Sequence, residues 1–337
     1  MWESIFGHSR IIAMLQTMLE KKRLPHALLF AGPSGVGKAM AARALAASLF
    51  CGNTAPCGYC SSCIAFTRQS HAGLFSIMPD RGSIKIDQIR ALGREAGLGS
   101  PSGQARVCII YDAEKMTLQA ANSLLKLLEE PPREFYFILV ASAAHALPGT
   151  IISRCLTVKF LPLAPSVVTK ILTEQGFASK QAEVAAAVSG GRLGQALKLV
   201  EPGGLDNRNI ALMIAETVTV QQGNWFFNEM ALFDKRSSSD HPEILRFMNM
   251  IFRDMALLQS FAKQELVLNS DCIDQLYQIA SQWSDKALIK ACKRIRDADR
   301  ALAANANAKM TWEALVLELA HMAKEEEIGA NRCRYTV

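Results

Sequence analysis

The sequence predicts an α/β fold in which a doubly wound parallel sheet carries a phosphate-binding loop, followed by an all-helical region. Three observations support this prediction. Apolar runs of strand length alternate with amphipathic helical patterns from Ser9 to Phe160, which favours parallel strands joined by helices. A glycine-rich loop stands between the first predicted strand and the next helix. From Leu205 onward the patterns are mostly helical.

Composition limits the functional classes. The chain has 337 residues, half of them apolar, which is enough for two or three packed domains. Its net charge of +6 permits contact with nucleic acid without demanding it. The best candidate for a membrane span, Phe135 to Ile152, contains Ser142, His145 and Pro148, and Met1 to Ser4 has no signal-peptide character. We therefore expect a cytoplasmic protein without membrane contact.

Periodicity places the elements of the sheet domain. Apolar residues at helical spacing predict helices over residues 9–20, 40–49, 84–98 and 117–130. Apolar runs predict strands over residues 27–30, 74–78, 107–111 and 135–140, and a last strand that runs through Phe160. The run Val107 to Tyr111 is apolar throughout, as expected for a strand covered on both faces of a parallel sheet.

The glycine-rich loop is the candidate nucleotide site. Its backbone N–H groups and the start of the following helix would face an anion, and Lys38 would reach toward the outer phosphates. Ala39 stands where a hydroxyl should hold magnesium, so the metal site is incomplete. An ordinary glycine-rich helix start is the alternative, and the strand-then-helix context favours the phosphate site. The predicted nucleotide-binding residues are Gly32, Pro33, Ser34, Gly35, Val36, Gly37, Lys38 and Ala39.

Four of the nine cysteines bunch together. Cys51, Cys57, Cys60 and Cys63 contain two C-x-x-C steps that share Cys60, and this spacing lets four thiolate sulfurs wrap one tetrahedral ion. Free cysteines and a redox-active C-x-x-C are the alternatives, but a closed four-cysteine cluster in a helix-end loop fits a structural site better. The sequence therefore predicts a structural Zn²⁺ ion within residues 51–63, in a reducing compartment.

Two acidic residues that are not adjacent to each other follow the strand predicted at residues 107–111. In P-loop ATPases the strand at this place ends in two adjacent carboxylates, one for magnesium and one to polarise the attacking water. Here Ala113 separates Asp112 from Glu114, so at most one of them can point at a nucleotide as the adjacent pair would.

The second half of the chain predicts two helical parts. Helical patterns over residues 166–174, 180–189 and 192–200 predict three short helices, and residues 201–204 form the clearest linker. Trp225, Phe226 and Phe227 are predicted to pack in a helix bundle rather than to form a cofactor site. An apolar stripe at steps of three and four predicts a buried helix face made of Ile244, Phe247, Met248, Ile251, Met255 and Leu258.

Four segments carry a family resemblance: Leu24 to Phe30, the four-cysteine insert, Ala120 to Pro132, and Ser153-Arg154-Cys155. In this order they resemble the AAA+ subunits of bacterial DNA polymerase III clamp loaders, over roughly the first half of the chain. The remainder is similar in layout only. The resemblance implies an AAA+ P-loop domain over residues 1–162 with a zinc insert, a helical lid over 163–203, an all-helical collar or oligomerisation domain over 204–325, and a disordered tail over 326–337.

That family contains active ATPase subunits, called gamma or tau, and delta-prime subunits that serve as rigid stators. Besides Ala39, the acidic motif departs from the active pattern. An ungapped match puts Tyr111 at the magnesium-linked acid and Asp112 at the catalytic glutamate, with Glu114 further on. Sliding the match by one residue restores the first acid at Asp112 but leaves Ala113 at the second.

The lid segment is the third departure. Ser189 to Leu197 resembles the segment that supplies an arginine to the γ-phosphate in active subunits, and the match places Gly194 at that arginine. Arg192 stands two residues away, on another helical face. Losing the metal hydroxyl, the acidic pair and the lid arginine together should remove hydrolysis, because phosphoryl transfer depends on charge placed around the leaving group.

The resemblance therefore implies a non-hydrolysing, delta-prime-type subunit of the DNA polymerase III holoenzyme, which helps load the sliding clamp onto primed DNA. Binding of ATP or ADP stays open. Arg154, with Ser153 and Cys155 as its motif, resembles an arginine that reaches the nucleotide of a neighbouring ATPase in trans. The implied partners are gamma or tau ATPase and delta subunits, the sliding clamp, and primed DNA within the complex.

Two alternatives stay open. An active gamma- or tau-type ATPase would hydrolyse ATP as an isolated chain. A freestanding zinc-bearing nucleic-acid-binding protein would bind DNA alone, with strong salt dependence.

Overall fold

The computed structural model describes residues 1–97, 104–220, 240–260 and 266–333. These residues form two compact units, one of residues 1–176 with 189–196 and the other of residues 177–188 with 197–337. The lid predicted over residues 163–203 contributes to both units, and the predicted domain boundaries stay a prediction. Trp225, Phe226 and Phe227 lie outside the described residues.

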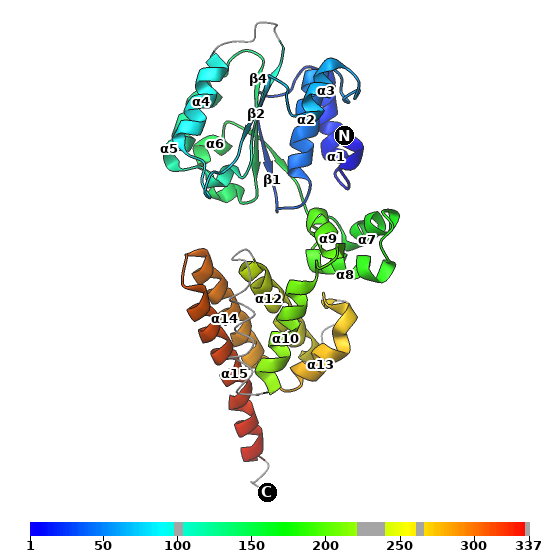
Figure 1. The fold of residues 1–337 in the computed structure, drawn as a ribbon, viewed down its shortest axis with the longest axis vertical. Helices are drawn as coiled ribbons and strands as arrows, with labels where there is room; N and C mark the ends of the chain where they lie inside the picture. The colour runs from blue at the N-terminus through cyan, green and yellow to red at the C-terminus, as the bar shows by residue number, and fades with distance from the viewer. Residues whose placement is uncertain (98–103, 221–239, 261–265, 334–337) are drawn as a thin grey trace. The chain divides into compact units, whose positions relative to one another are not determined.

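The first unit contains a five-stranded parallel sheet with the order β2-β3-β4-β1-β5 (Figure 1). The predicted parallel α/β class is therefore confirmed. In chain order the strands are β1 Ala27–Ala31, β2 Leu74–Ile77, β3 Arg106–Ile110, β4 Phe135–Ala141 and β5 Leu156–Lys159. Leu28 and Leu29 are fully buried because each faces one of two separate cores, one on either side of the sheet.

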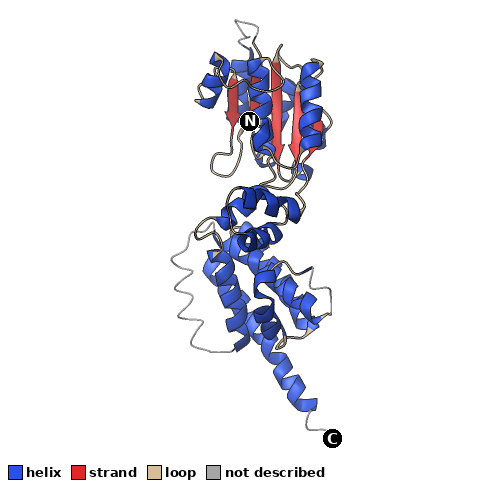
Figure 2. Cartoon of the chain, turned by 90° about the vertical axis from the view of Figure 1, so that its right-hand side faces the viewer, coloured by secondary structure: helices blue, strands red, loops and turns tan. Residues whose placement is uncertain are grey.

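Helices cover both faces of this sheet (Figures 1 and 2). One face packs on η1 Trp2–Ser4, α1 Ser9–Glu20, α2 Lys38–Cys51 and α3 Ser61–Thr67. The other packs on α4 Ile86–Gly97, η2 Ala113–Lys115, α5 Leu118–Glu129 and α6 Gly149–Ile152, with η3 Ala144–Ala146 beside it. The predicted elements are found within a few residues of their expected ends, although β3 ends at Ile110 and Leu98 lies outside the described residues.

Three short helices follow the sheet: α7 Pro165–Glu174, α8 Ser179–Ser189 and α9 Leu193–Val200. The second unit then continues with α10 Asp206–Val220, α12 Asp240–Gln259, η5 Ser270–Cys272, α13 Ile273–Ala280, α14 Asp285–Ala303 and α15 Ala308–Cys333. Helix α15 continues past residue 326, where the sequence predicts the tail to begin.

Helix α12 is the centre of the second unit, because it packs against α10, α13 and α14. All six residues of its predicted apolar stripe are buried, which confirms that prediction. The fully buried carboxylate of Asp254 accepts hydrogen bonds from the backbone of Leu268 and from the backbone and side chain of Asn269. Within the parts of the chain that the structure describes, no helix combines the length and apolar character needed to cross a membrane.

Candidate nucleotide site and metal centre

The phosphate-binding loop connects β1 to α2 at the carboxyl end of β1. Gly32 is required at its start, because a Cβ atom there would lie 2.0 Å from the backbone oxygen of Phe160. Gly37 has a φ of 100° and directly precedes Lys38, the first residue of α2. The loop therefore ends in a left-handed turn that aims backbone N–H groups at the space in front of the helix.

The Lys38 side chain folds back onto its own loop. Its Nζ donates hydrogen bonds to the carbonyl oxygens of Gly32 and Pro33 and lies 3.4 Å from Oγ of Ser142 at the end of β4. Burial lowers the pKa of Lys38, and the carboxylates of Glu114 and Asp112 act in the opposite direction. The ammonium group of Lys38 is therefore held by loop carbonyl oxygens, with carboxylate charge close by, and its role as a phosphate ligand stays a prediction.

The acids after β3 are not arranged as a pair. Asp112 has a φ of 46°, and its carboxylate accepts a hydrogen bond from Nζ of Lys115 at 3.1 Å, on a half-exposed surface. Glu114 turns back toward the loop, where Oε1 accepts a hydrogen bond from the Ser142 backbone at 3.0 Å. Its Oε2 is buried and has no hydrogen-bond partner among the described residues. Tyr111 packs against the apolar core on the α2 side of the sheet.

The lid segment contacts the phosphate-binding loop directly. The Gly194 backbone N–H donates to the carbonyl oxygen of Gly35 at 2.8 Å. A Cβ atom on Gly194 would lie 3.1 Å from that oxygen, so the approach leaves little room for a side chain. Arg192 is half-buried, and its Nε donates to the carbonyl oxygen of Ser189. Gly194, the residue at the position expected for the lid arginine, therefore contacts the loop residue Gly35 through its backbone.

A buried histidine holds the loop from the other side. His8 precedes α1, its Nε2 lies 2.8 Å from the carbonyl oxygen of Val36, and its ring packs edge-on against Phe160. Burial lowers the pKa of His8, which favours the neutral ring. Beside it is an open cavity of about 360 Å³, lined by Gly7, His8, Ser9, Arg10, Ile11, Lys159, Leu161, Pro162 and Leu163.

The Ser153-Arg154-Cys155 motif joins α6 to β5. Ser153 Oγ and Arg154 Nη1 both donate to the carbonyl oxygen of Thr150, each at 3.1 Å. Arg154 Nη2 forms an ion pair with Oε1 of Glu129 at 2.5 Å, and the Arg154 side chain is 37% exposed. Cys155 packs against the core, and burial raises the pKa of its thiol to about 11. The arginine of the motif therefore faces outward, whereas the cysteine faces the core.

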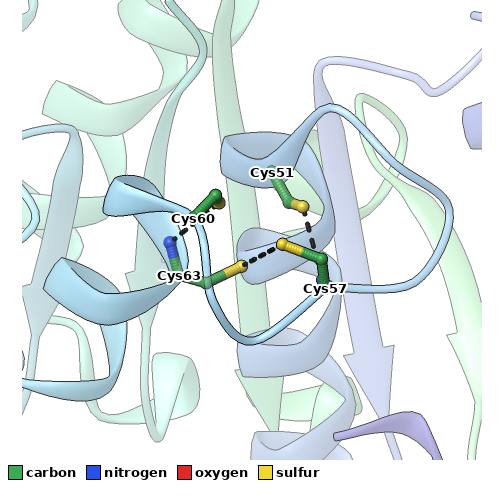
Figure 3. A group of neighbouring side chains, drawn as sticks. All are labelled: Cys51, Cys57, Cys60 and Cys63. Carbon is green, nitrogen blue, oxygen red and sulfur yellow. Dashed lines mark hydrogen bonds between the residues drawn. The ribbon is translucent and has the colours of Figure 1, made fainter.

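The four clustered cysteines converge on one point (Figure 3). Cys51 ends α2, Cys57 lies in the following turn, Cys60 precedes α3, and Cys63 lies within α3 rather than in a loop. Their sulfur atoms all lie within 4.8 Å of one another, and Cys57 Sγ and Cys63 Sγ are 4.0 Å apart. Tetrahedral zinc with bonds of about 2.3 Å separates its sulfur ligands by roughly 3.8 Å, so the geometry fits zinc.

The electrostatics of the cluster also suit a cation. The backbone N–H groups of Cys57 and Cys63 donate to Sγ of Cys51 and Cys60 at 3.4 Å. Backbone hydrogen bonds at Tyr59 and Cys60 lower the pKa of Cys57 to about 6, whereas burial raises the pKa of Cys63 to about 12. A metal ion must therefore displace protons from the less acidic thiols when it binds.

Comparisons with known proteins agree across both units. The family model described as DNA polymerase III, delta subunit matches residues 7–164, and a second model, for the C-terminal part of the delta subunit, matches residues 210–321. The DNA polymerase III subunit delta′ of Bacillus subtilis is 32% identical over 318 residues, which cover 92% of this chain and 95% of the relative. The chain belongs to the delta′ family of DNA polymerase III subunits.

Other DNA polymerase III subunits are more distant relatives of this delta′ family member. The tau subunit of Bacillus subtilis is 28% identical over 83% of this chain and 54% of its own length. A gamma subunit-related protein from Thermotoga maritima has the same fold, with a TM-score of 0.50 at 16% identity, covering 93% of this chain and 99% of that one.

Sequence reasoning did not identify three contacts of this delta′ family member. Ser142 could have been found, because it directly follows β4, whose end pairs with the end of β1. His8 has no local signal, since its partner Val36 is far along the chain. Glu129 lies in the family segment Ala120 to Pro132, but its contact with Arg154 could not be predicted because it depends on how α5 and α6 pack.

Proposed function

We propose that this chain is a non-hydrolysing delta′ stator of a bacterial clamp loader. One observation carries the proposal: the loop keeps its glycines and Lys38, while positions 39, 112 and 194 lack a free catalytic group. Ala39 is exposed and offers no hydroxyl, Asp112 is paired with Lys115, and Gly194 occupies the lid-arginine position. Because phosphoryl transfer is accelerated mainly by such placed charges, turnover of ATP should be negligible.

The pocket keeps the groups that recognise a nucleotide without reacting with it. Lys38 and the loop amides face the phosphate position, and the cavity beside His8 has room for a nucleoside. Glu114 adds negative charge near the same position. We therefore assign weak binding of ADP or ATP to this pocket, with a structural rather than a catalytic role.

Arg154 supplies the catalytic contribution to a neighbour. Arg154 lies in the turn before β5, and the first paired residue of β5, Leu156, is aligned with Leu28, four residues before Gly32. At about 3.3 Å per residue, roughly 13 Å of strand already separate the start of β5 from the phosphate-binding loop of its own chain. A side chain of this length cannot cover that distance. Its half-exposed guanidinium therefore serves a nucleotide on another subunit, where its permanent charge and planar fork suit phosphate.

The remaining parts of the proposal follow from the same role. The partners are gamma or tau ATPase and delta subunits, together with the sliding clamp and primed DNA. Cys51, Cys57, Cys60 and Cys63 hold one structural Zn²⁺ ion, which fixes the segment between α2 and α3 and takes no part in the reaction.

The test is reconstitution. Purified chain is mixed with gamma or tau and delta subunits of the same organism, and assembly is followed by size-exclusion chromatography with ATPase measured in the presence of clamp and primed DNA. We expect a defined complex in which Arg154→Ala lowers turnover at least about tenfold, whereas exposed Arg68→Ala on the opposite face of the sheet leaves it unchanged. Two results would overturn the proposal. One is brisk ATP hydrolysis by the isolated chain that is lost in Lys38→Ala. The other is unchanged ATP turnover in the complex that carries Arg154→Ala.

A further inference from the structure

The guanidinium of Arg154 is held at two points from two different elements. Nη2 pairs with Oε1 of Glu129, the last residue of α5, and Nη1 donates to the carbonyl oxygen of Thr150 in α6. A guanidinium carries five N–H bonds, so three remain available in the same plane. The fork is therefore oriented, with donors to spare, before any phosphate is bound.

Glu129 occupies an electrostatically unfavourable position. It ends α5, where the helix dipole places partial negative charge, and Glu130 adds a second carboxylate directly after it. A carboxylate at a helix C-terminus is normally destabilising, so its presence needs a compensating contact. Among the described residues, the cation paired with Glu129 is Arg154.

The pair is too exposed to be explained by stability. The side chains of Arg154 and Glu129 are 37% and 49% exposed, and half-exposed ion pairs contribute little to folding. What the contact does fix is direction, because a long arginine side chain otherwise samples many rotamers. Fixing it beforehand lowers the entropy that must be lost when the fork meets a phosphate.

We infer that Glu129 is a positioning residue, which holds the Arg154 fork in the orientation that the nucleotide of the neighbouring subunit requires. This inference rests on the proposed role of Arg154 in trans. Glu129 itself touches neither nucleotide nor substrate, so it acts only through the arginine. Its removal should therefore lower the kcat of the assembled loader and leave the KM for ATP nearly unchanged.

The experiment compares complexes assembled from full-length chains that carry Arg154→Ala, Glu129→Ala, Glu129→Gln, Glu130→Gln, or Arg154→Ala together with Glu129→Ala. Steady-state kcat and KM for ATP are measured with clamp and primed DNA, and thermal melting checks each isolated chain. Glu129→Ala should lower kcat by about three- to tenfold at unchanged melting temperature. Glu129→Gln should recover part of the loss, because its amide oxygen still accepts from Nη2.

The double variant and the neighbouring acid make the test decisive. Glu130→Gln removes the same charge from the same helix end and should leave kcat unchanged. The double variant should match Arg154→Ala alone, because Glu129 has nothing left to position. The role of Glu129 would be overturned, and that of Arg154 kept, if Arg154→Ala lowers kcat while Glu129→Ala leaves kcat unchanged. A kcat of the double variant below that of Arg154→Ala alone would lead to the same conclusion. Normal turnover in Arg154→Ala would overturn both.

Discussion

Glu114 should oppose nucleotide binding, and Glu114→Gln should strengthen it. The substitution keeps the side-chain oxygen that accepts from the Ser142 backbone and removes only the charge. It also replaces a buried carboxylate oxygen that has no hydrogen-bond partner among the described residues, so the fold should not be weakened. The expected result is tighter binding of ADP in the absence of divalent metal.

The geometry around Ser142 gives the size of the effect. Lys38 Nζ lies 3.4 Å from Ser142 Oγ, and the Ser142 backbone nitrogen lies 3.0 Å from Glu114 Oε1. Since both groups contact Ser142, we take about 7 Å as the separation between a phosphate oxygen bound to Lys38 and the Glu114 carboxylate. Two unit charges at that distance repel by about 2.4 kcal/mol at an effective dielectric constant of 20 and by about 0.6 kcal/mol in water. An intermediate value near 1.2 kcal/mol corresponds to a Kd about sevenfold lower in the variant.

The assay is isothermal titration of ADP into the purified chain in EDTA, at low and at high salt. Asp112→Asn is the matched control, and it should change the Kd less, because the Asp112 carboxylate is half-exposed and already paired with Lys115. The advantage of Glu114→Gln should shrink at high salt as screening increases. The reasoning fails if Glu114→Gln binds ADP no more tightly than the wild type, or if Asp112→Asn has the larger effect.

Three further predictions concern the metal centre, the phosphate-binding loop and a buried histidine. Zinc affinity should fall as the pH falls, because the ion binds thiolates. Cys63→Ser should lower the zinc content measured by mass spectrometry, and an unchanged zinc content would contradict the site. Gly32→Ala should lower the free energy of unfolding by about 3–5 kcal/mol, because its Cβ would clash with the Phe160 oxygen and its φ would be strained. Gly82→Ala, with open space around it, should lower it by about 1 kcal/mol. Urea unfolding measures both losses, and equal losses would refute the clash. Burial lowers the pKa of His241 below 6.5. Its neutral form therefore contributes stability that is present above pH 6.5 and is lost as the pH falls through the pKa of the folded state. His241→Asn should reduce this loss of stability, measured as the melting temperature at a series of pH values.

Elements with a strong local period could be predicted from the sequence. Helix α1 begins and ends at Ser9 and Glu20 as the apolar spacing indicates. The buried strands were recognisable because a central strand of a parallel sheet is apolar on both faces. The cysteine cluster was equally predictable, since its spacing alone limits how the chain can fold around one ion. In each case the information lies within a short stretch of sequence.

Contacts between distant segments could not be predicted in this way. Trp2 donates its indole N–H to Ser48 and to the backbone of Thr54, which ties the start of the chain to the four-cysteine segment, yet no pattern near Trp2 indicates this. The approach of Gly194 to Gly35 has the same character, because the missing side chain has meaning only beside its partner. Local sequence patterns specify helices and strands, whereas the packing of these elements determines which residues of the site come into contact.

The phosphate-binding loop and Arg154 lie at opposite ends of the parallel strands. The loop follows the carboxyl end of β1, whereas Arg154 precedes the amino end of β5. In a head-to-tail arrangement, each interface joins the arginine edge of one subunit to the nucleotide edge of the next. Under the proposed function, this chain supplies an arginine and needs none in return, because the described residues around its own pocket lack the groups that an incoming arginine would assist.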